Sequence, residues 1–191
     1  MKLTRLIPIL FIAAGLLICG YGTFHIWHGH KQEKVTLKKA EALSTMPKDS
    51  ISLKNFNPYK GDTIGLMDLP KLKATLPIVE GTNENQLAKG VGHYSTSSFP
   101  GQHNQIVLSG HRDTVFRHVG DLEKGDQIIL HFPFGTFTYT VDHTKIVMAD
   151  DKTIIHSTKP KEELVLTTCY PFYYIGNAPK RYIIYAYPSK A

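Results

Sequence analysis

From Thr63 onward, the chain consists of short runs of β-branched, aromatic and aliphatic residues separated by turn residues. Such runs, about four to eight residues long and bounded by Gly, Asp or Asn, predict strands rather than helices. About seven to eight short strands with brief connections predict a closed or nearly closed β-barrel, a mainly β fold with short helices. We expect strands at Ile64–Leu66, Ala74–Val79, Gln105–Ser109, Gln127–Phe132, Phe137–Val147, Leu164–Thr168 and Arg181–Tyr187, and a short helix at Glu84–Lys89.

The beginning of the chain is strongly apolar. Residues 6–27 contain no Lys, Arg, Asp or Glu, whereas Lys2 and Arg5 precede them. About 20 apolar residues span a bilayer as a helix, and positive flanks stay in the cytoplasm. We therefore predict a cytoplasmic N-terminus at 1–5 and a transmembrane signal anchor at 6–27, with the rest of the chain outside the cell. A cleaved signal peptide with its cleavage site at Gly20-Tyr21-Gly22 is the alternative, but the apolar run is long for one.

The region between the anchor and the strands has a different composition. Residues 28–62 are polar, rich in Lys and interrupted by Pro and Gly. This composition predicts an irregular extracellular stalk, with one helix around Lys31–Leu43. The β-barrel domain then occupies residues 63–191.

Charge and cysteine content exclude several classes of function. The formal net charge is +6, but Lys and Arg are scattered and form no basic stripe, so we predict no nucleic-acid partner. A domain close to an anionic cell envelope accounts for the positive balance equally well. Cys19 and Cys169 lie far apart in the chain, which argues against a disulfide framework and a structural zinc site. We assign no metal to the histidines at positions 25, 28 and 30, and we expect no cofactor.

Three chemically versatile residues lie at the ends of expected strands. His111 follows the apolar run Ile106–Gly110, Cys169 ends the run Glu163–Thr168, and Arg181 begins the last strand. A strand end is a place where a rigid sheet can direct a side chain into a groove. A thiol, an imidazole and a guanidinium can supply the nucleophile, the proton carrier and the oxyanion partner of an acyl transfer.

Two familiar motifs do not account for these residues. His111-Arg112-Asp113 matches the start of a kinase catalytic loop, but that loop requires Asn where this chain has His118, and no Gly-rich loop is present. Papain-like proteases place the cysteine before the histidine, whereas here His111 precedes Cys169 by 58 residues.

The motifs resemble those of the sortases, the membrane-anchored cysteine transpeptidases of Gram-positive bacteria. The sortase Thr-Leu-x-Thr-Cys motif corresponds to Val165-Leu166-Thr167-Thr168-Cys169, with Val in place of the first Thr. The histidine motif corresponds to Leu108–Thr114 and the arginine motif to Ala178–Tyr182. The similarity extends over about residues 63–188, and the combined match is far more specific than any single motif.

Within this family the chain is most similar to class D. Gly110-His111-Arg112-Asp113-Thr114 and Cys169-Tyr170-Pro171-Phe172 resemble class D segments. Pilus-building class C enzymes usually carry an Asp-Pro-aromatic lid, and Asn57-Pro58-Tyr59 is weakly similar to it. A pilin-polymerising sortase is therefore the alternative. The resemblance implies a closed sortase-type barrel.

The resemblance also implies a reaction and its partners. A surface protein with a C-terminal Leu-Pro-x-Thr-Gly-like sorting signal would be attacked by Cys169 at the carbonyl of the signal's Thr. Arg181 would stabilise the substrate or the oxyanion, and His111 would protonate the leaving amine and later deprotonate the incoming amine. A peptidoglycan precursor or another cell-wall amino group would release the thioacyl enzyme. The membrane would be contacted through the N-terminal helix.

Three further residues are candidates for substrate binding, and two alternative functions remain open. Thr168 is expected to line the substrate groove, and His93 to line the groove or serve the structure. Asp113 is expected either to orient His111 or Arg112 or to be an exposed loop carboxylate, and the sequence does not separate the two. One alternative is an inactive barrel that only binds a sorting signal, and the intact His111, Cys169 and Arg181 argue against it. A hydrolytic cysteine endopeptidase shares the thioacyl intermediate, so the sequence does not separate hydrolysis from transfer.

Overall fold

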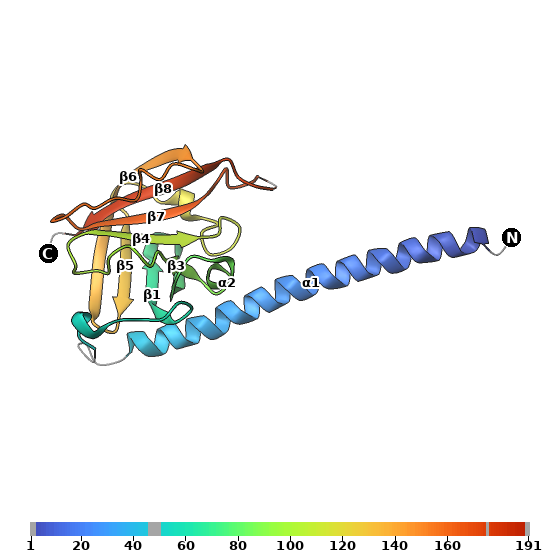
Figure 1. The fold of residues 1–191 in the computed structure, drawn as a ribbon, viewed down its shortest axis with the longest axis horizontal. Helices are drawn as coiled ribbons and strands as arrows, with labels where there is room; N and C mark the ends of the chain where they lie inside the picture. The colour runs from blue at the N-terminus through green and yellow to red at the C-terminus, as the bar shows by residue number, and fades with distance from the viewer. Residues whose placement is uncertain (1–2, 46–50, 175, 190–191) are drawn as a thin grey trace.

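Within residues 3–45, 51–174 and 176–189, which the computed structural model describes, eight strands pair edge to edge and close a barrel (Figure 1). The strands are β1 (Thr63–Leu69), β2 (Ala74–Glu80), β3 (Val91–His93), β4 (Gln105–Gly110), β5 (Gln127–Phe132), β6 (Gly135–Met148), β7 (Glu163–Tyr170) and β8 (Lys180–Pro188). Their order around the barrel is β1-β2-β3-β4-β7-β8-β6-β5, and β5 pairs with β1. β2 with β3 and β4 with β7 are parallel pairs, and the remaining pairs are antiparallel. The predicted closed barrel is confirmed.

The helical elements are few. They are α1 (Leu3–Ser44), α2 (Glu84–Leu87) and the 3₁₀ turns η1 (Leu53–Asn55), η2 (Pro70–Leu72) and η3 (Val119–Asp121). The predicted helix at Glu84–Lys89 corresponds to α2, which is two residues shorter. The predicted strand at Gln127–Phe132 has the bounds of β5, and most other predicted strands are extended by one to three residues at an end.

The short strand β3 falls in a stretch for which the sequence predicts no strand. It pairs with β2 on one side and β4 on the other, so it completes the barrel. Gly92 makes this pairing possible, because a Cβ atom there would lie 2.5 Å from the backbone oxygen of Gly81. A strand of three residues with a glycine at its centre carries no alternation of apolar residues, which is why the sequence did not predict it.

The barrel interior holds the main hydrophobic core. Alternate residues of a strand point to opposite faces. Leu164 and Leu166 of β7 point inward, where they join core side chains from the other strands of the barrel. A second, smaller cluster lies on the outer face of β4, β7, β8 and β6. Its members are Val107, Val147, Ile154, Val165, Ile183 and Tyr185, with Tyr94 packed against them.

Helix α1 contains the helix predicted around Lys31–Leu43. It runs from Leu3 to Ser44, so the first part of the predicted stalk at 28–62 is helical and continues the preceding apolar segment without a break. The segment 31–44 contains Lys, Glu, Ala and Leu, which favour helices, and no Gly or Pro interrupts it. Thr36 and Ala40 are buried where this half of α1 packs against β1 and β2. Pro47 of the predicted stalk lies outside the described residues.

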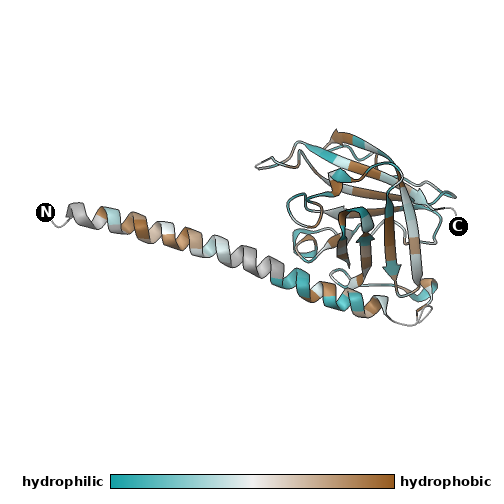
Figure 2. Cartoon of the chain, turned by 180° about the vertical axis from the view of Figure 1, so that it is seen from behind, coloured by the Kyte–Doolittle hydropathy of each residue, from teal (hydrophilic) through white to brown (hydrophobic). Residues whose placement is uncertain are grey.

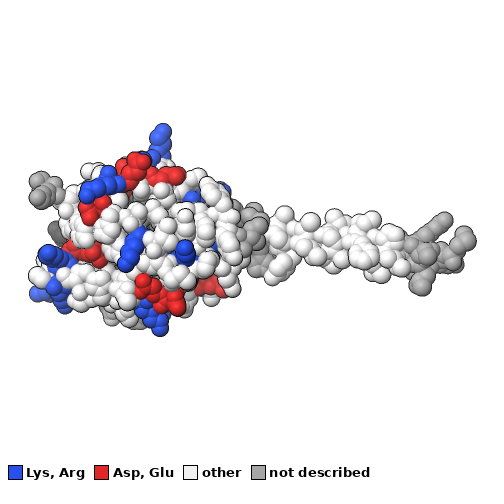
Figure 3. Space-filling view, turned by 90° about the horizontal axis from the view of Figure 1, so that it is seen from above, with Lys and Arg blue, Asp and Glu red and all other residues white. Residues whose placement is uncertain are grey.

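The other half of α1 projects away from the barrel (Figure 1). Its apolar side chains are exposed, including Leu10, Phe11, Leu17 and Ile18, each between 67% and 76% accessible. Figure 2 shows this apolar character along the projecting segment, and Figure 3 shows Lys, Arg, Asp and Glu interspersed over the barrel instead. Among the described residues, no helix combines the length and the apolarity required to cross a membrane.

Candidate active site

Strand pairing brings together the three residues that the sequence predicts to be catalytic. β4 and β7 run parallel, with Gly110 beside Thr168. β7 and β8 run antiparallel, with Cys169 directly opposite Arg181. His111 follows Gly110 as Cys169 follows Thr168, so the histidine reaches the level of the thiol along the neighbouring strand. The register therefore gathers His111, Cys169 and Arg181 from three adjacent strands.

Cys169 and Arg181 lie on the outer face of the barrel. In β7, Leu166 points inward and Val165 belongs to the outer cluster, so Cys169, four residues after Val165, shares the outer face. Residues directly opposite each other in an antiparallel pair have Cβ atoms about 4.5–5.5 Å apart. Both side chains are half-buried, and Cys169 is a free thiol. A group bound at the thiol is therefore within reach of the guanidinium.

A tight turn positions His111 at the end of β4. The backbone N–H of Phe116 donates a hydrogen bond to the His111 oxygen over 3.0 Å, and the Phe116 ring is fully buried in the core. Gly110 leaves room for this ring, because a Cβ atom there would lie 2.5 Å from Phe116 Cδ2. The His111 side chain is half-exposed and, within the described part of the chain, its ring has no hydrogen-bond partner. The imidazole is thus held close to the thiol and remains available to a substrate.

Thr168 fixes the two strands that carry the thiol and the imidazole. Its side chain is 3% exposed, and Oγ1 donates a hydrogen bond of 2.7 Å to the Gly110 oxygen. This bond joins β7 to β4 one residue before Cys169 and one residue before His111. The structure therefore places Thr168 beneath the site, and its contact with substrate remains a prediction.

The guanidinium of Arg181 is partly engaged. Nη1 donates hydrogen bonds to the backbone oxygens of Ala178 and Lys180, at 3.2 and 2.9 Å. Among the described residues, neither Nε nor Nη2 has a hydrogen-bond partner. One edge of the guanidinium is thus anchored to the connection between β7 and β8, and the other donors are available for an oxyanion.

Arg112 joins two segments of the candidate site through contacts that the sequence did not reveal. Its Nη2 donates hydrogen bonds to the backbone oxygens of Tyr174 (2.6 Å) and Gly176 (2.9 Å), and the guanidinium carbon lies 5.8 Å from the Tyr174 ring centroid. These contacts tie the turn that carries His111 to the β7–β8 connection that leads to Arg181. The only signal in the sequence is that Arg112 is adjacent to His111, and adjacency does not identify a partner 62 residues away.

Asp113 is exposed, and its described contact is made by the backbone. The Asp113 oxygen accepts hydrogen bonds from Nε and Nη2 of Arg117, at 3.0 and 2.7 Å. In the described residues its carboxylate has no hydrogen-bond partner, so it does not orient the His111 ring in this structure. A role of Asp113 toward substrate remains a prediction.

His93 lies inside the protein. It is fully buried, with Nδ1 2.7 Å from the Glu80 carboxylate and Nε2 3.1 Å from Ser97 Oγ. Ser97 Oγ also accepts a hydrogen bond from the backbone N–H of Val107 in β4, and the ring stacks on Phe99 at 4.4 Å. His93 can therefore influence the site only through its neighbours. Neither Glu80 nor Ser97 is distinguished by the sequence alone.

The β6–β7 connection is fastened at the end of β4 and β7 away from Cys169, where Gln105 pairs with Glu163. Gln105 Nε2 donates hydrogen bonds to the Ile154 oxygen and to Glu163, and Gln105 Oε1 accepts one from the His156 backbone. These bonds hold the segment that carries Ile154, which packs in the outer cluster. Burial and the hydrogen bond to Glu163 raise the pKa of Tyr187 to about 12, so its hydroxyl stays a neutral donor to that carboxylate.

This arrangement can perform acyl transfer through a thioester. A cysteine on a rigid strand supplies the nucleophile, a neighbouring imidazole can carry protons, and an adjacent guanidinium can stabilise an oxyanion.

Comparisons with known proteins agree with this geometry. The chain matches the sortase domain family over residues 67–189, more than half of its length. It is 51% identical to Sortase D of Bacillus subtilis (strain 168) over 95% of this chain and 96% of the relative. It is also 23% identical to Sortase A of Bacillus anthracis, over 92% and 89% of the two chains.

Solved structures show the same fold. A Sortase D5 transpeptidase of Clostridium perfringens superposes with a TM-score of 0.72 at 23% identity, covering 84% of this chain and 99% of the other. A sortase C of the same species, solved with the C-terminal cell wall sorting motif, gives a TM-score of 0.65 at 25% identity, covering 84% and 89%. The family match, the similarity to Sortase D and the converging cysteine, histidine and arginine lead to one conclusion: the chain belongs to the sortase family of cysteine transpeptidases.

Proposed function

We propose that this chain anchors surface proteins to the cell wall by cleaving a Leu-Pro-x-Thr-Gly-like C-terminal sorting signal and transferring the product to a cell-wall amino group. The observation that carries the proposal is the register that sets Cys169 opposite Arg181 and beside His111. The likeness to the sortase C structure containing a sorting motif supports the type of substrate.

The proposed reaction has two steps. The Cys169 thiol gives its proton to His111, the resulting thiolate attacks the carbonyl carbon of the signal's Thr, and Arg181 donates hydrogen bonds to the oxyanion. His111 gives a proton to the leaving Gly amine, which departs as the peptide bond breaks. In the second step, His111 takes a proton from the incoming amine, which attacks the thioester and releases the Cys169 sulfur. Thr168, from beneath, keeps the strands of His111 and Cys169 in register.

We further propose that residues 6–27 anchor the enzyme in the cell membrane, with residues 1–5 in the cytoplasm and residues 63–191 outside. The exposed apolar side chains of α1 support this topology, since a helix that is apolar on all sides is not stable in water. Protease added to intact protoplasts is expected to remove the barrel domain, and full protection of that domain would contradict the topology.

The catalytic proposal is tested by the mass of the products. Full-length enzyme in neutral detergent is incubated with a Leu-Pro-x-Thr-Gly peptide, with and without a peptidoglycan-like amine. We expect cleavage between Thr and Gly, a thioester adduct at Cys169, and a peptide–amine product that forms only with the acceptor. The Cys169→Ala variant is expected to show no turnover.

Other outcomes separate the alternatives. Release of the free acid at the same rate with and without acceptor would identify a hydrolytic endopeptidase. Substantial turnover by Cys169→Ala would place the nucleophile elsewhere. A pilin-polymerising role has less support. A lid has to lie over the active site, whereas the lid-like Asn57-Pro58-Tyr59 directly follows Phe56, which packs on Phe99 and Phe134 at ring distances of 5.1 and 4.9 Å.

A further inference from the structure

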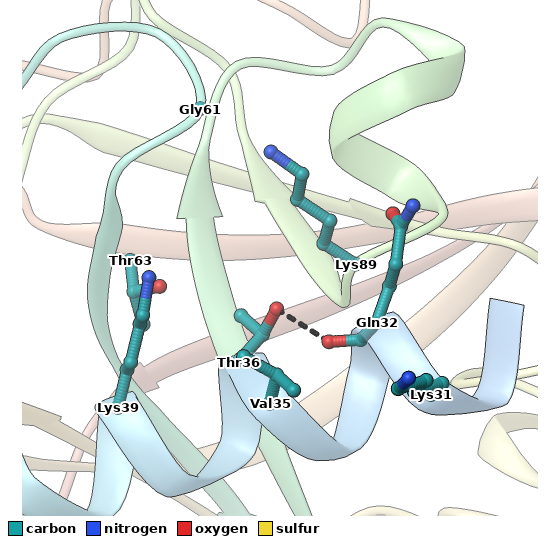
Figure 4. A pocket seen from close by; sticks show the side chains of 8 residues that line it. All are labelled: Lys31, Gln32, Val35, Thr36, Lys39, Gly61, Thr63 and Lys89. Atoms are coloured by element: carbon teal, nitrogen blue, oxygen red, sulfur yellow. Dashed lines mark hydrogen bonds between the residues drawn. The ribbon is translucent and has the colours of Figure 1, made fainter. Parts of the chain in front are cut away.

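A cavity of about 350 Å³ lies between α1 and the barrel, at the place where the helix leaves the domain (Figure 4). It is formed by one face of the second half of α1, the chain around Gly61 and Thr63 at the start of β1, and Lys89 after α2. None of its lining residues belongs to the catalytic site.

The lining is cationic. Three lysines contribute to it, Lys31, Lys39 and Lys89, and no Asp or Glu lines the cavity. In Figure 4, Lys89 extends toward Gly61 and Lys39 lies beside Thr63. A Cβ atom built on Gly61 would lie 3.8 Å from Lys89 Nζ, which places the ammonium group against the chain that precedes β1. Positive charges gathered in a concave site raise the local concentration of anions.

Nearby carboxylates in the described residues are engaged elsewhere. The Asp62 carboxylate, between Gly61 and Thr63, accepts a hydrogen bond of 2.9 Å from the Tyr59 backbone. The Glu80 carboxylate is buried against His93. Within the part of the chain that the structure describes, neither Lys39 nor Lys89 forms an ion pair, so their charges are not neutralised by the protein.

We propose that this cavity binds a phosphate group, most readily that of an anionic lipid on the extracellular face of the cell membrane. Ammonium groups bind phosphate as point charges, and several of them suit an anion with several oxygens. The hydroxyl of Thr63 adds a hydrogen-bond donor to the same wall. The site is separate from the peptide chemistry of the proposed function.

The position along α1 favours a lipid as the source. A helix rises about 1.5 Å per residue, so Lys31 to Lys39 lie about 6–18 Å beyond residue 27, the end of the proposed anchor. The polar headgroup region extends about 5–8 Å beyond the hydrocarbon core on each side, so Lys31 lies at its level and Lys39 lies beyond it. The lipid source thus rests on the proposed anchor, whereas phosphate binding itself does not.

The test measures binding directly. Isotope-labelled full-length protein in neutral detergent is titrated with dihexanoyl phosphatidylglycerol, dihexanoyl phosphatidylcholine, inorganic phosphate and acetate, and backbone amide shifts are followed by NMR. We expect phosphatidylglycerol to shift the amides of Thr36, Thr63 and Lys89 saturably, and acetate to shift them far less. The double variant K39Q/K89Q is expected to weaken binding at least tenfold.

A matched control removes the same charge from other faces. K54Q/K145Q loses two exposed lysines outside the cavity and is expected to bind as the wild type does. Saturable shifts with inorganic phosphate as well as phosphatidylglycerol would support a general phosphate site, and shifts with phosphatidylglycerol alone a lipid headgroup site. Absence of saturable shifts with both, or equal binding by K39Q/K89Q and wild type, would overturn the proposal. Peptide cleavage by K39Q/K89Q should remain at the wild-type rate, so the result is independent of the catalytic proposal.

Discussion

Two histidines near the same strand pair, β3–β4, have opposite surroundings. His93 ends β3 opposite Leu108, fully buried, with Glu80 and Ser97 at its two ring nitrogens. His111 directly follows the end of β4 and is half-exposed, and its ring has no hydrogen-bond partner among the described residues. The comparison shows that burial and occupied hydrogen-bonding atoms, rather than residue type, decide which imidazole can exchange a proton with a substrate.

After the loss of the nucleophile itself in Cys169→Ala, the largest effect on turnover is expected at His111. His111→Gln keeps a polar side chain but cannot carry a proton, so kcat/KM should fall by about 10²–10⁴-fold, the scale of general acid–base catalysis. The barrel should remain folded, since the lost ring is half-exposed and makes no described hydrogen bond. Steady-state kinetics with the sorting-signal peptide, with circular dichroism as folding control, provide the measurement. A variant within threefold of wild type would mean that another group carries the proton.

Arg181→Lys is expected to have the next largest effect. Lysine keeps the positive charge but loses the planar guanidinium, whose Nη1 is held by Ala178 and Lys180 while Nε and Nη2 have no partner among the described residues. We expect a loss of about 10²–10³-fold in kcat/KM, as for removal of one oxyanion donor. Arg181→Ala should lose at least as much. Near wild-type activity of Arg181→Lys would show that charge alone is required, and that backbone amides hold the oxyanion.

Arg112→Lys tests whether the turn of His111 and the β7–β8 connection must be tied together. A lysine cannot reproduce the paired hydrogen bonds to the Tyr174 and Gly176 oxygens. Because small displacements of catalytic groups are costly, we expect kcat to fall on the order of tenfold. Arg117→Lys is the control, because within the described residues this neighbouring arginine bonds only to the Asp113 backbone. Equal effects of the two variants on kcat would argue against a specific positioning role for Arg112.

Local patterns in the sequence predict most of the strands and single out three residues that the fold brings together. The run Gln127–Phe132 is β5, because its β-branched and aromatic residues are bounded by turn residues. His111, Cys169 and Arg181 were identified from motifs at strand ends, and the register brings them together. The pairing of β4 with β7 joins segments 58 residues apart, and no local pattern encodes such a contact.

The elements that the sequence did not predict depend on tertiary contacts. Strand β3 exists because Gly92 allows close approach between neighbouring strands. The helix around Lys31–Leu43 was predicted from its residues, but its packing on the barrel through Thr36 and Ala40 was not. The hydrogen bonds of Arg112 and the burial of His93 follow from how distant segments fold together, so a single sequence does not reveal them.

The smallest effect on turnover, and a large effect on stability, is expected at His93. In His93→Phe the Glu80 carboxylate would be left buried without its partner, which should lower the free energy of unfolding by about 3–5 kcal/mol. Adding Glu80→Leu should recover part of that loss, because replacing both polar partners by apolar groups can be nearly neutral. Urea denaturation of wild type, His93→Phe and the double variant measures these differences. Under conditions where the double variant is folded, kcat/KM per folded molecule should stay within about twofold of wild type. His93 is buried, the register sets His111 near Cys169, and one general acid–base group suffices for this chemistry. A much larger loss of kcat/KM in a fully folded double variant would show that His93 supports the substrate site. His93 and His111 would then differ in their distance from the substrate rather than in whether they contribute to turnover.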